Sequence, residues 1–141
     1  MHKALAVAAG LSLGLLGLLT TSTAANADGS ETAQRIVVPA YFTDSPSWKA
    51  IGSSAPTAAM AIANVAAGPG DIASPTWQPL IGTAHRHGVR VLGYVDTGYF
   101  GQTGGLTRAG DGSVSAWVAQ AEADVNEWYA LYGSDIGGIY F

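Results

Sequence analysis

The chain has 141 residues, no cysteine and a formal net charge of −4. The lack of cysteine excludes disulfide bonds and thiolate metal sites. The excess of carboxylates argues against nucleic acid and anionic membranes as partners, because both attract basic surfaces.

The first 27 residues have the three parts of a secretory signal peptide. A basic start, Met1–Lys3, precedes an uncharged apolar run over residues 4–19, and Ala25-Asn26-Ala27 forms an A-x-A cleavage site. The alternative is a membrane anchor, but this run of 16 residues is shorter than the roughly 20 that a spanning helix needs. We therefore expect a secreted, extracellular protein that has no membrane segment after cleavage.

The rest of the chain divides into a tether over residues 28–34 and one domain over residues 35–141. The tether is composed of small and polar residues, which is typical of flexible segments. In the domain, four apolar runs have the length of strands and cover residues 36–42, 59–65, 89–95 and 136–141. Three of the four are apolar on both alternating faces, as in strands that are buried on both sides.

Helical patterns separate these runs. A short helix is expected from Ser47 toward Gly52, and a longer one starts at Ser74-Pro75 and ends at Gly88. The last helix, 114–132, ends at Gly133. Its expected apolar face consists of Val114, Trp117, Val118, Ala121, Val125, Trp128 and Tyr132, and the polar residues expected off that face are Gln120, Glu122, Asp124 and Glu127.

The resulting order is β-α-β-α-β-α-β. This alternation predicts an α/β fold with parallel strands and right-handed helical crossovers. Two architectures fit the pattern, an open doubly wound sheet and a closed (β/α)8 barrel. An eight-unit barrel takes roughly 250 residues, so three βα units and a fourth strand amount to less than half of one.

Candidate ligand-binding residues lie where the strands end, because functional groups in parallel α/β folds gather at that edge. They are Tyr41, Trp48, Asn64, Asp96 and Tyr99, with Asp44 as a second candidate acid. Two interpretations remain open for Asp96, a ligand contact or a cap on the N–H groups of its turn. The aromatic residues either form a wall on which a sugar stacks or pack in the core.

Two other motifs do not predict a site. Residues 68–73 match G-x-G-x-x-A, but the helix starts after them and Pro69 removes an N–H that a dinucleotide phosphate would need. His85 and His87 are two apart on a helix and point in different directions, so they are poorly placed to share a metal ion. No G-x-S-x-G hydrolase motif is present. We expect no cofactor and no metal.

Four stretches resemble, in order, the spherulation-specific family 4 proteins. They are VPAYFTDSPSW (38–48), AIANVAAGPG (61–70), RVLGYVDTGY (90–99) and WYALYGSDIGGIYF (128–141). Residues 65–67 depart from the pattern, since the family usually has a proline and small polar residues there. The resemblance implies a (β/α)8 TIM-type barrel that is related to secreted glycoside hydrolases acting on galactosamine-containing polysaccharides.

The resemblance also implies where the catalytic acids lie. In the family, a strand like residues 138–141 leads into an Asp-Glu pair, and a further acid comes from a later strand. We therefore expect the N-terminal half of the barrel, truncated after strand four and inactive by itself. Glycoside hydrolysis usually takes two carboxylates, and the strand ends here offer Asp96 and, less well placed, Asp44. The alternative is a non-catalytic carbohydrate-binding protein or a structural protein of the spore or cell wall.

Overall fold

The computed structural model describes residues 34–141, so the expected signal peptide and all of the tether except Gln34 lie outside the described residues. The described elements are, in order, β1 (Ile36–Ala40), α1 (Ser45–Ser53), β2 (Ala58–Ala63), α2 (Trp77–Arg86), β3 (Arg90–Tyr94), the 3-10 turn η1 (Gly98–Gly101), α3 (Val114–Tyr132), the 3-10 turn η2 (Gly133–Asp135) and β4 (Gly138–Tyr140). In this part of the chain, no helix is both long and apolar enough to cross a membrane.

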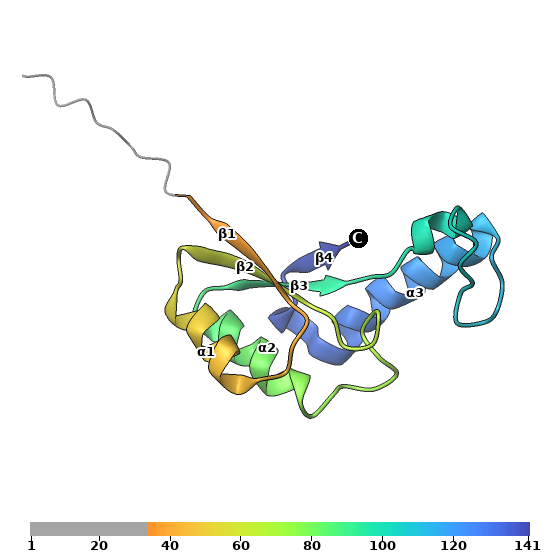
Figure 1. Ribbon diagram of the computed structural model, residues 1–141. Helices are drawn as coiled ribbons and strands as arrows, with labels where there is room; N and C mark the ends of the chain where they lie inside the picture. The colour runs from red at the N-terminus through yellow and green to blue at the C-terminus, as the bar shows by residue number, and fades with distance from the viewer. Residues whose placement is uncertain (1–33) are drawn as a thin grey trace, which may run out of the picture. The chain divides into compact units, whose positions relative to one another are not determined.

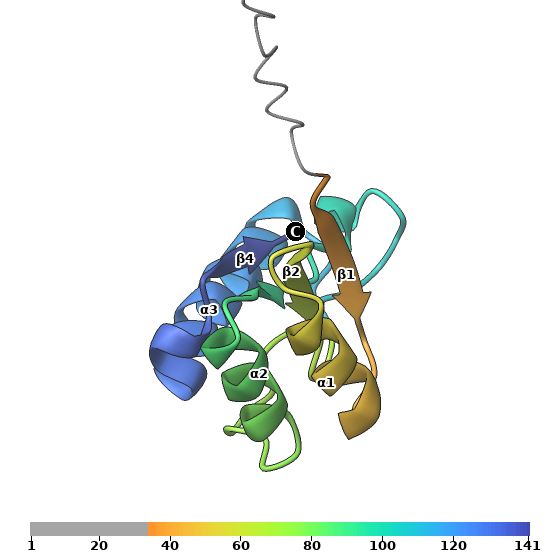
Figure 2. The same ribbon diagram turned by 90° about the vertical axis from the view of Figure 1, so that its left-hand side faces the viewer.

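The four strands form one parallel sheet in the order β1-β2-β3-β4. The order follows the chain without a reversal, so right-handed crossovers place every helix on the same face. Figures 1 and 2 show α1, α2 and α3 on that face, and no described helix covers the opposite face. A doubly wound sheet would reverse direction and carry helices on both faces. The arrangement is therefore that of a partial (β/α)8 barrel, and the barrel is not closed.

The core lies between the sheet and the helices. Its strand residues are small, and Ala40, Ala61 and Ala63 are fully buried beneath α1 and α2. Gly93 of β3 lies directly against Trp128 of α3, where a Cβ atom would come within 2.5 Å of the indole ring. The Trp128 Nε1–H donates a 2.8 Å hydrogen bond to the backbone oxygen of Tyr94. Large aromatic side chains from the helices thus fill the space that small strand residues leave.

The ends of α2 largely agree with the sequence pattern. The helix begins at Trp77, slightly later than expected, but the Ser74 hydroxyl still accepts a hydrogen bond from the Trp77 N–H at 3.4 Å. At the other end Gly88 has a φ of +83°. The N–H groups of Gly88 and Val89 donate to the oxygens of His85 and Ala84. These two bonds form a Schellman motif, which needs the left-handed conformation that glycine adopts readily.

The expected apolar face of α3 was partly wrong. Asp124, expected off that face, is only 2% exposed, whereas Val114 and Val118 are 60% and 38% exposed. The reason is that α3 packs against loops as well as against the sheet. Arg108 reaches α3 from a loop and forms an ion pair with Asp124, which makes burial of this carboxylate possible. A helical pattern read from apolar residues alone misses a buried charge of this kind.

Candidate functional site

The uncovered face of the sheet carries a row of polar and aromatic side chains at the carboxyl ends of the strands. Ala40 pairs with Ala63, Ala63 with Gly93, and Gly93 with Ile139. These residues face the helices, and side chains alternate along a strand. The next row therefore lies on the uncovered face and consists of Tyr41, Asn64, Tyr94 and Tyr140. We call these four residues the tyrosine row.

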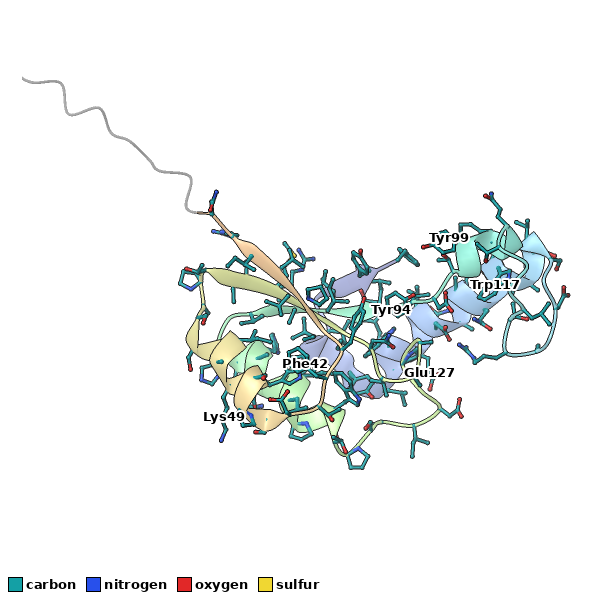
Figure 3. The ribbon with its side chains drawn as sticks, viewed as in Figure 1. Phe42, Lys49, Tyr94, Tyr99, Trp117 and Glu127 are labelled. Atoms are coloured by element: carbon teal, nitrogen blue, oxygen red, sulfur yellow. The ribbon has the colours of Figure 1, made fainter. Side chains whose placement is uncertain are left out.

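The rings of the tyrosine row are close together. Tyr41 and Tyr94 have ring centroids 5.7 Å apart, although two strands that flank a third are separated by roughly 9.6 Å. The two rings must therefore lean toward each other over Asn64, which lies between them. On the other side of Tyr94, the ring centroids of Tyr94 and Tyr140 are 6.4 Å apart. Figure 3 labels Tyr94 near the centre of the described region.

Asn64 has a buried acceptor without a partner. Its Oδ1 atom is enclosed and accepts no hydrogen bond from any described residue. A buried polar atom that lacks a partner costs about 1–3 kcal/mol, so such atoms are rare in folded proteins and need an explanation. A ligand that brings a hydroxyl or N–H donor between Tyr41 and Tyr94 would supply the missing bond.

The phenols of Tyr41 and Tyr94 stay protonated at neutral pH. Burial raises the pKa of Tyr94, and the Asp96 carboxylate and the neighbouring tyrosines raise it further. Burial also raises the pKa of Tyr41, and Tyr140 adds to this effect. Each hydroxyl is therefore an uncharged group that donates and accepts hydrogen bonds, next to an apolar ring face.

Asp96 follows β3, two residues beyond Tyr94, and its charge acts on the Tyr94 phenol. Its Oδ1 accepts a hydrogen bond from the Gly98 N–H at 2.8 Å, so the turn-capping contact is present. The residue is half-buried, and its charge contributes to the raised pKa of both Tyr94 and Arg108. The cap and a place beside the tyrosine row are thus compatible.

Tyr99 stands on an unusual segment of backbone. The four residues of η1 all have positive φ values, between 50° and 78°, and Tyr99 and Phe100 adopt them without being glycine. Gly98 packs so closely on the indole of Trp117 that no Cβ would fit. Tyr99 is 73% exposed, and its phenol adds to the raised pKa of Tyr94. Figure 3 labels Tyr99 and Trp117 at the same end of the described region.

Trp48 and Asp44 lie outside the row. Trp48 is 1% exposed, contacts Trp77 edge to face, and donates its Nε1–H to the Phe42 oxygen at 2.8 Å. The aromatic residues were expected either to form a sugar-stacking wall or to pack in the core, and the surroundings of Trp48 match core packing. Asp44 is the N-cap of α1, where its Oδ1 accepts from the Ser47 N–H at 3.0 Å. Hydrogen bonding by the side chain and the backbone N–H of Ser47 lowers the pKa of the Asp44 carboxyl.

The sequence pattern missed Tyr94 and Tyr140 because both were counted as strand residues. Counting back by two from Asp96 would have pointed to Tyr94, but no candidate followed the fourth strand from which Tyr140 could have been found. The ion pair between Arg108 and Asp124 was also missed. No periodic signal marks it, because Arg108 lies in an irregular loop.

A groove of about 430 Å³ lies elsewhere on the described region. It runs along the exposed side of α3, and its lining is mostly apolar, including Phe100, Val118, Val125 and Phe141. An apolar surface of this kind is typical of packing against protein. The tyrosine row, in contrast, combines ring faces with groups that orient a polar ligand.

The chemistry available at the row favours binding a flat, hydroxyl-rich molecule. Tyrosine rings stack on apolar ring faces, and their hydroxyls together with Asn64 and Asp96 offer hydrogen-bond partners. Among the described residues Asp96 is the one carboxylate beside the row, whereas hydrolysis of a glycosidic bond usually takes two.

Comparison with known proteins gives the family. No curated protein and no solved structure matched the chain significantly. A family model described as "Spherulation-specific family 4" matches residues 35–141, which is the whole described domain apart from Gln34. The chain belongs to spherulation-specific family 4.

Proposed function

We propose that this protein is exported and acts on a polysaccharide that contains amino sugars, with the tyrosine row as part of its sugar-binding site. The observation that carries the proposal is the enclosed, unpartnered Oδ1 of Asn64 between Tyr41 and Tyr94. A sugar offers both an apolar ring face for the tyrosines and a hydroxyl or N–H donor for this oxygen. The relation of family 4 to glycoside hydrolases suggests the polymer, and the A-x-A site suggests export.

In this proposal residues 35–141 are the first half of a (β/α)8 domain. The catalytic acid pair then comes from the strand ends that follow Phe141, and Asp96 contacts the sugar or orients that pair. Two features support the proposal. The sheet has an uncovered face, and parallel sheets are normally covered on both faces. The described residues also provide a single carboxylate at the row, which is insufficient for the usual mechanism.

The second candidate function is a non-catalytic carbohydrate-binding or wall-associated role, for which a single carboxylate at the row is sufficient. Reading the codons that follow Phe141 separates the two functions. An Asp-Glu pair directly after Phe141 supports hydrolysis. Its absence, together with binding of polysaccharide without release of sugar, supports the binding role.

The test of the sugar site is Asn64→Leu in the complete gene product. Leucine is similar in size and removes the unpartnered oxygen, so thermal stability should stay equal or rise. Affinity for the polysaccharide should fall about three- to tenfold, because one neutral hydrogen bond to the ligand contributes about 0.5–1.5 kcal/mol. Binding is measured by a pull-down on insoluble polysaccharide and by titration calorimetry with soluble oligosaccharides.

Asn126→Leu is the matched control, since Asn126 lies exposed on α3, away from the row. It should leave affinity unchanged. If Asn64→Leu binds as tightly as the wild type, Asn64 is not in the site. If it is less stable than the wild type, the Asn64 oxygen has a structural partner and the argument from the unpartnered atom fails.

A further inference from the structure

The ion pair between Arg108 and Asp124 joins three segments that are distant in the sequence. Asp124 is on α3 and is buried, and Arg108 comes from the loop between β3 and α3. Both terminal nitrogens of the Arg108 guanidinium donate to the two carboxylate oxygens, one of them at 2.9 Å. This two-bond geometry is the strongest that an arginine makes with a carboxylate, and it also sets the orientation of both groups.

The loop after β2 packs on the same ion pair. A Cβ atom on Gly68 would lie 3.1 Å from the Asp124 Oδ2, so the backbone of this loop approaches the carboxylate closely. One residue earlier, the Ala67 oxygen accepts a hydrogen bond from the Asp96 N–H at 3.3 Å. The loop that follows Asn64 is thus tied both to Asp96 and to the ion pair.

Further contacts hold the loop between β3 and α3 on the helix near Arg108. The Arg108 backbone N–H donates to the Gln120 Oε1 at 2.7 Å, and the Trp117 Nε1–H donates to the Gly105 oxygen at 3.3 Å. Thr107 is buried and exchanges hydrogen bonds with the backbone of Asp111. The loop therefore has a defined shape, and the guanidinium is its one charged attachment to a buried group of α3.

The charge state of Arg108 does not vary under ordinary conditions. Its hydrogen bonds to Asp124 raise the pKa of the guanidinium, and the charges of Asp71 and Asp96 act in the same direction. Arg108 is thus a permanent cation close to both Asp124 and the acid beside the tyrosine row.

We propose that Arg108 and Asp124 are positioning residues, which hold the loops after β2 and β3 so that Asp96 and Tyr99 lie beside the tyrosine row. The consequence for ligand binding rests on the proposed sugar site. The mechanical link between the ion pair and the two loops does not. Neither residue touches the ligand in this account. Loss of the ion pair should release the loop that carries Tyr99 while the sheet and the helices remain folded.

Limited trypsin digestion of the complete gene product tests the mechanical link. Trypsin cleaves after Arg108 in the loop and after Arg90 in β3, so the second bond reports global unfolding within the same sample. In Asp124→Asn, cleavage after Arg108 should accelerate about tenfold or more relative to cleavage after Arg90, because proteolysis follows local opening. Glu122→Gln is the control, because Glu122 is an exposed carboxylate on the same helix, and its cleavage ratio should equal that of the wild type.

Arg108→Lys is the second variant, in case Asp124→Asn does not fold. It keeps a positive charge next to Asp124 and a trypsin site at the same position, but loses the two-bond geometry. In this variant, cleavage after residue 108 relative to cleavage after Arg90 should increase less than in Asp124→Asn. An unchanged ratio in both variants overturns the proposal. An equal increase at both bonds also overturns it, because the ion pair then stabilises the whole fold and not this loop.

A double-mutant cycle with Tyr99→Ala tests the consequence for the site. In the wild type, Tyr99→Ala should weaken polysaccharide binding several-fold. In the Asp124→Asn background it should have little further effect, because the ring is no longer held in place. Additive effects of the two changes contradict positioning. If the wild type binds no polysaccharide, the proposed function fails, while the cleavage ratio still decides whether the ion pair holds the loop.

Discussion

Asp96 has two roles at the residue scale, and they depend on different properties of its side chain. The cap on the Gly98 N–H needs an acceptor oxygen, which asparagine also provides. The contribution of Asp96 to the raised pKa values of Tyr94 and Arg108 needs its negative charge. The substitution Asp96→Asn therefore separates the structural role from the electrostatic one.

We predict that Asp96→Asn leaves the melting temperature nearly unchanged and strongly reduces hydrolysis by the complete gene product. It should also lower the pKa of Tyr94, because removal of a nearby negative charge makes the phenolate easier to form. Burial still keeps that pKa above the ordinary value. Ultraviolet titration of the tyrosines and a reducing-sugar assay measure the two effects. Full activity would remove Asp96 from the site, and a large loss of stability would support a capping role alone.

Single residues also show what the sequence could predict. Tyr41 and Asn64 were expected because they lie at the carboxyl ends of strands, and the parallel register brings both into one row. Trp48 occupies a similar place in the sequence, but α1 turns it into the core. The direction of a side chain after a strand depends on the loop conformation, and no pattern of residue types contains that information.

At the element scale, β3 and α3 are held together by the close packing of a glycine against a tryptophan. A Cβ atom on Gly93 would lie 2.5–2.7 Å from three atoms of the Trp128 ring. The ring is fully buried and its Nε1–H is hydrogen-bonded, so it has little freedom to move aside. This contact fixes how closely α3 approaches the sheet, and through Asp124 it also sets the position of the loops.

We predict that Gly93→Ala destabilises the protein by about 1–3 kcal/mol or more, as overpacking of a filled core does. Thermal melting of the complete gene product measures the change. Gly105→Ala is the matched control, because the nearest atom to a Cβ there is 3.6 Å away. The control should be neutral or slightly stabilising. Equal melting temperatures for the wild type and Gly93→Ala would show that α3 can shift and that the close contact is not required.

The elements themselves were largely predictable. Four strands and three helices were expected in the observed order, because buried parallel strands and one-sided helices have distinct apolar patterns. The error at Asp124 arose because a helical pattern treats every carboxylate as solvent-exposed. Its partner Arg108 is sixteen residues away, in a loop without periodicity. A contact of this kind becomes visible only when the loop conformation is known.

At the scale of the whole molecule, the uncovered face of the sheet is the dominant feature. Ile36, Val37 and Tyr41 are exposed at one edge, and Tyr140 and Phe141 at the other. These edges are apolar and uncharged, which is the pattern of strands that pair with further chain. A closed barrel removes such edges altogether.

We therefore predict that residues 28–141, produced alone, self-associate and show no hydrolytic activity. Size-exclusion chromatography, thermal melting and a sugar-release assay make the measurement, with the complete gene product as the reference. A soluble monomer with a cooperative melt would contradict the prediction about the edges. Release of sugar by that monomer would contradict the requirement for a second carboxylate from outside these residues.

The most direct test of the sugar site is a crystal structure of the complete gene product with an oligosaccharide of the polymer that it binds. We predict a sugar ring against Tyr94, with Tyr41 or Tyr140 beside it. A hydroxyl or N–H of the sugar should lie about 2.7–3.2 Å from the Asn64 Oδ1. An oligosaccharide bound elsewhere, with the Asn64 oxygen paired to a group of the protein, would show that the tyrosine row is not the sugar site.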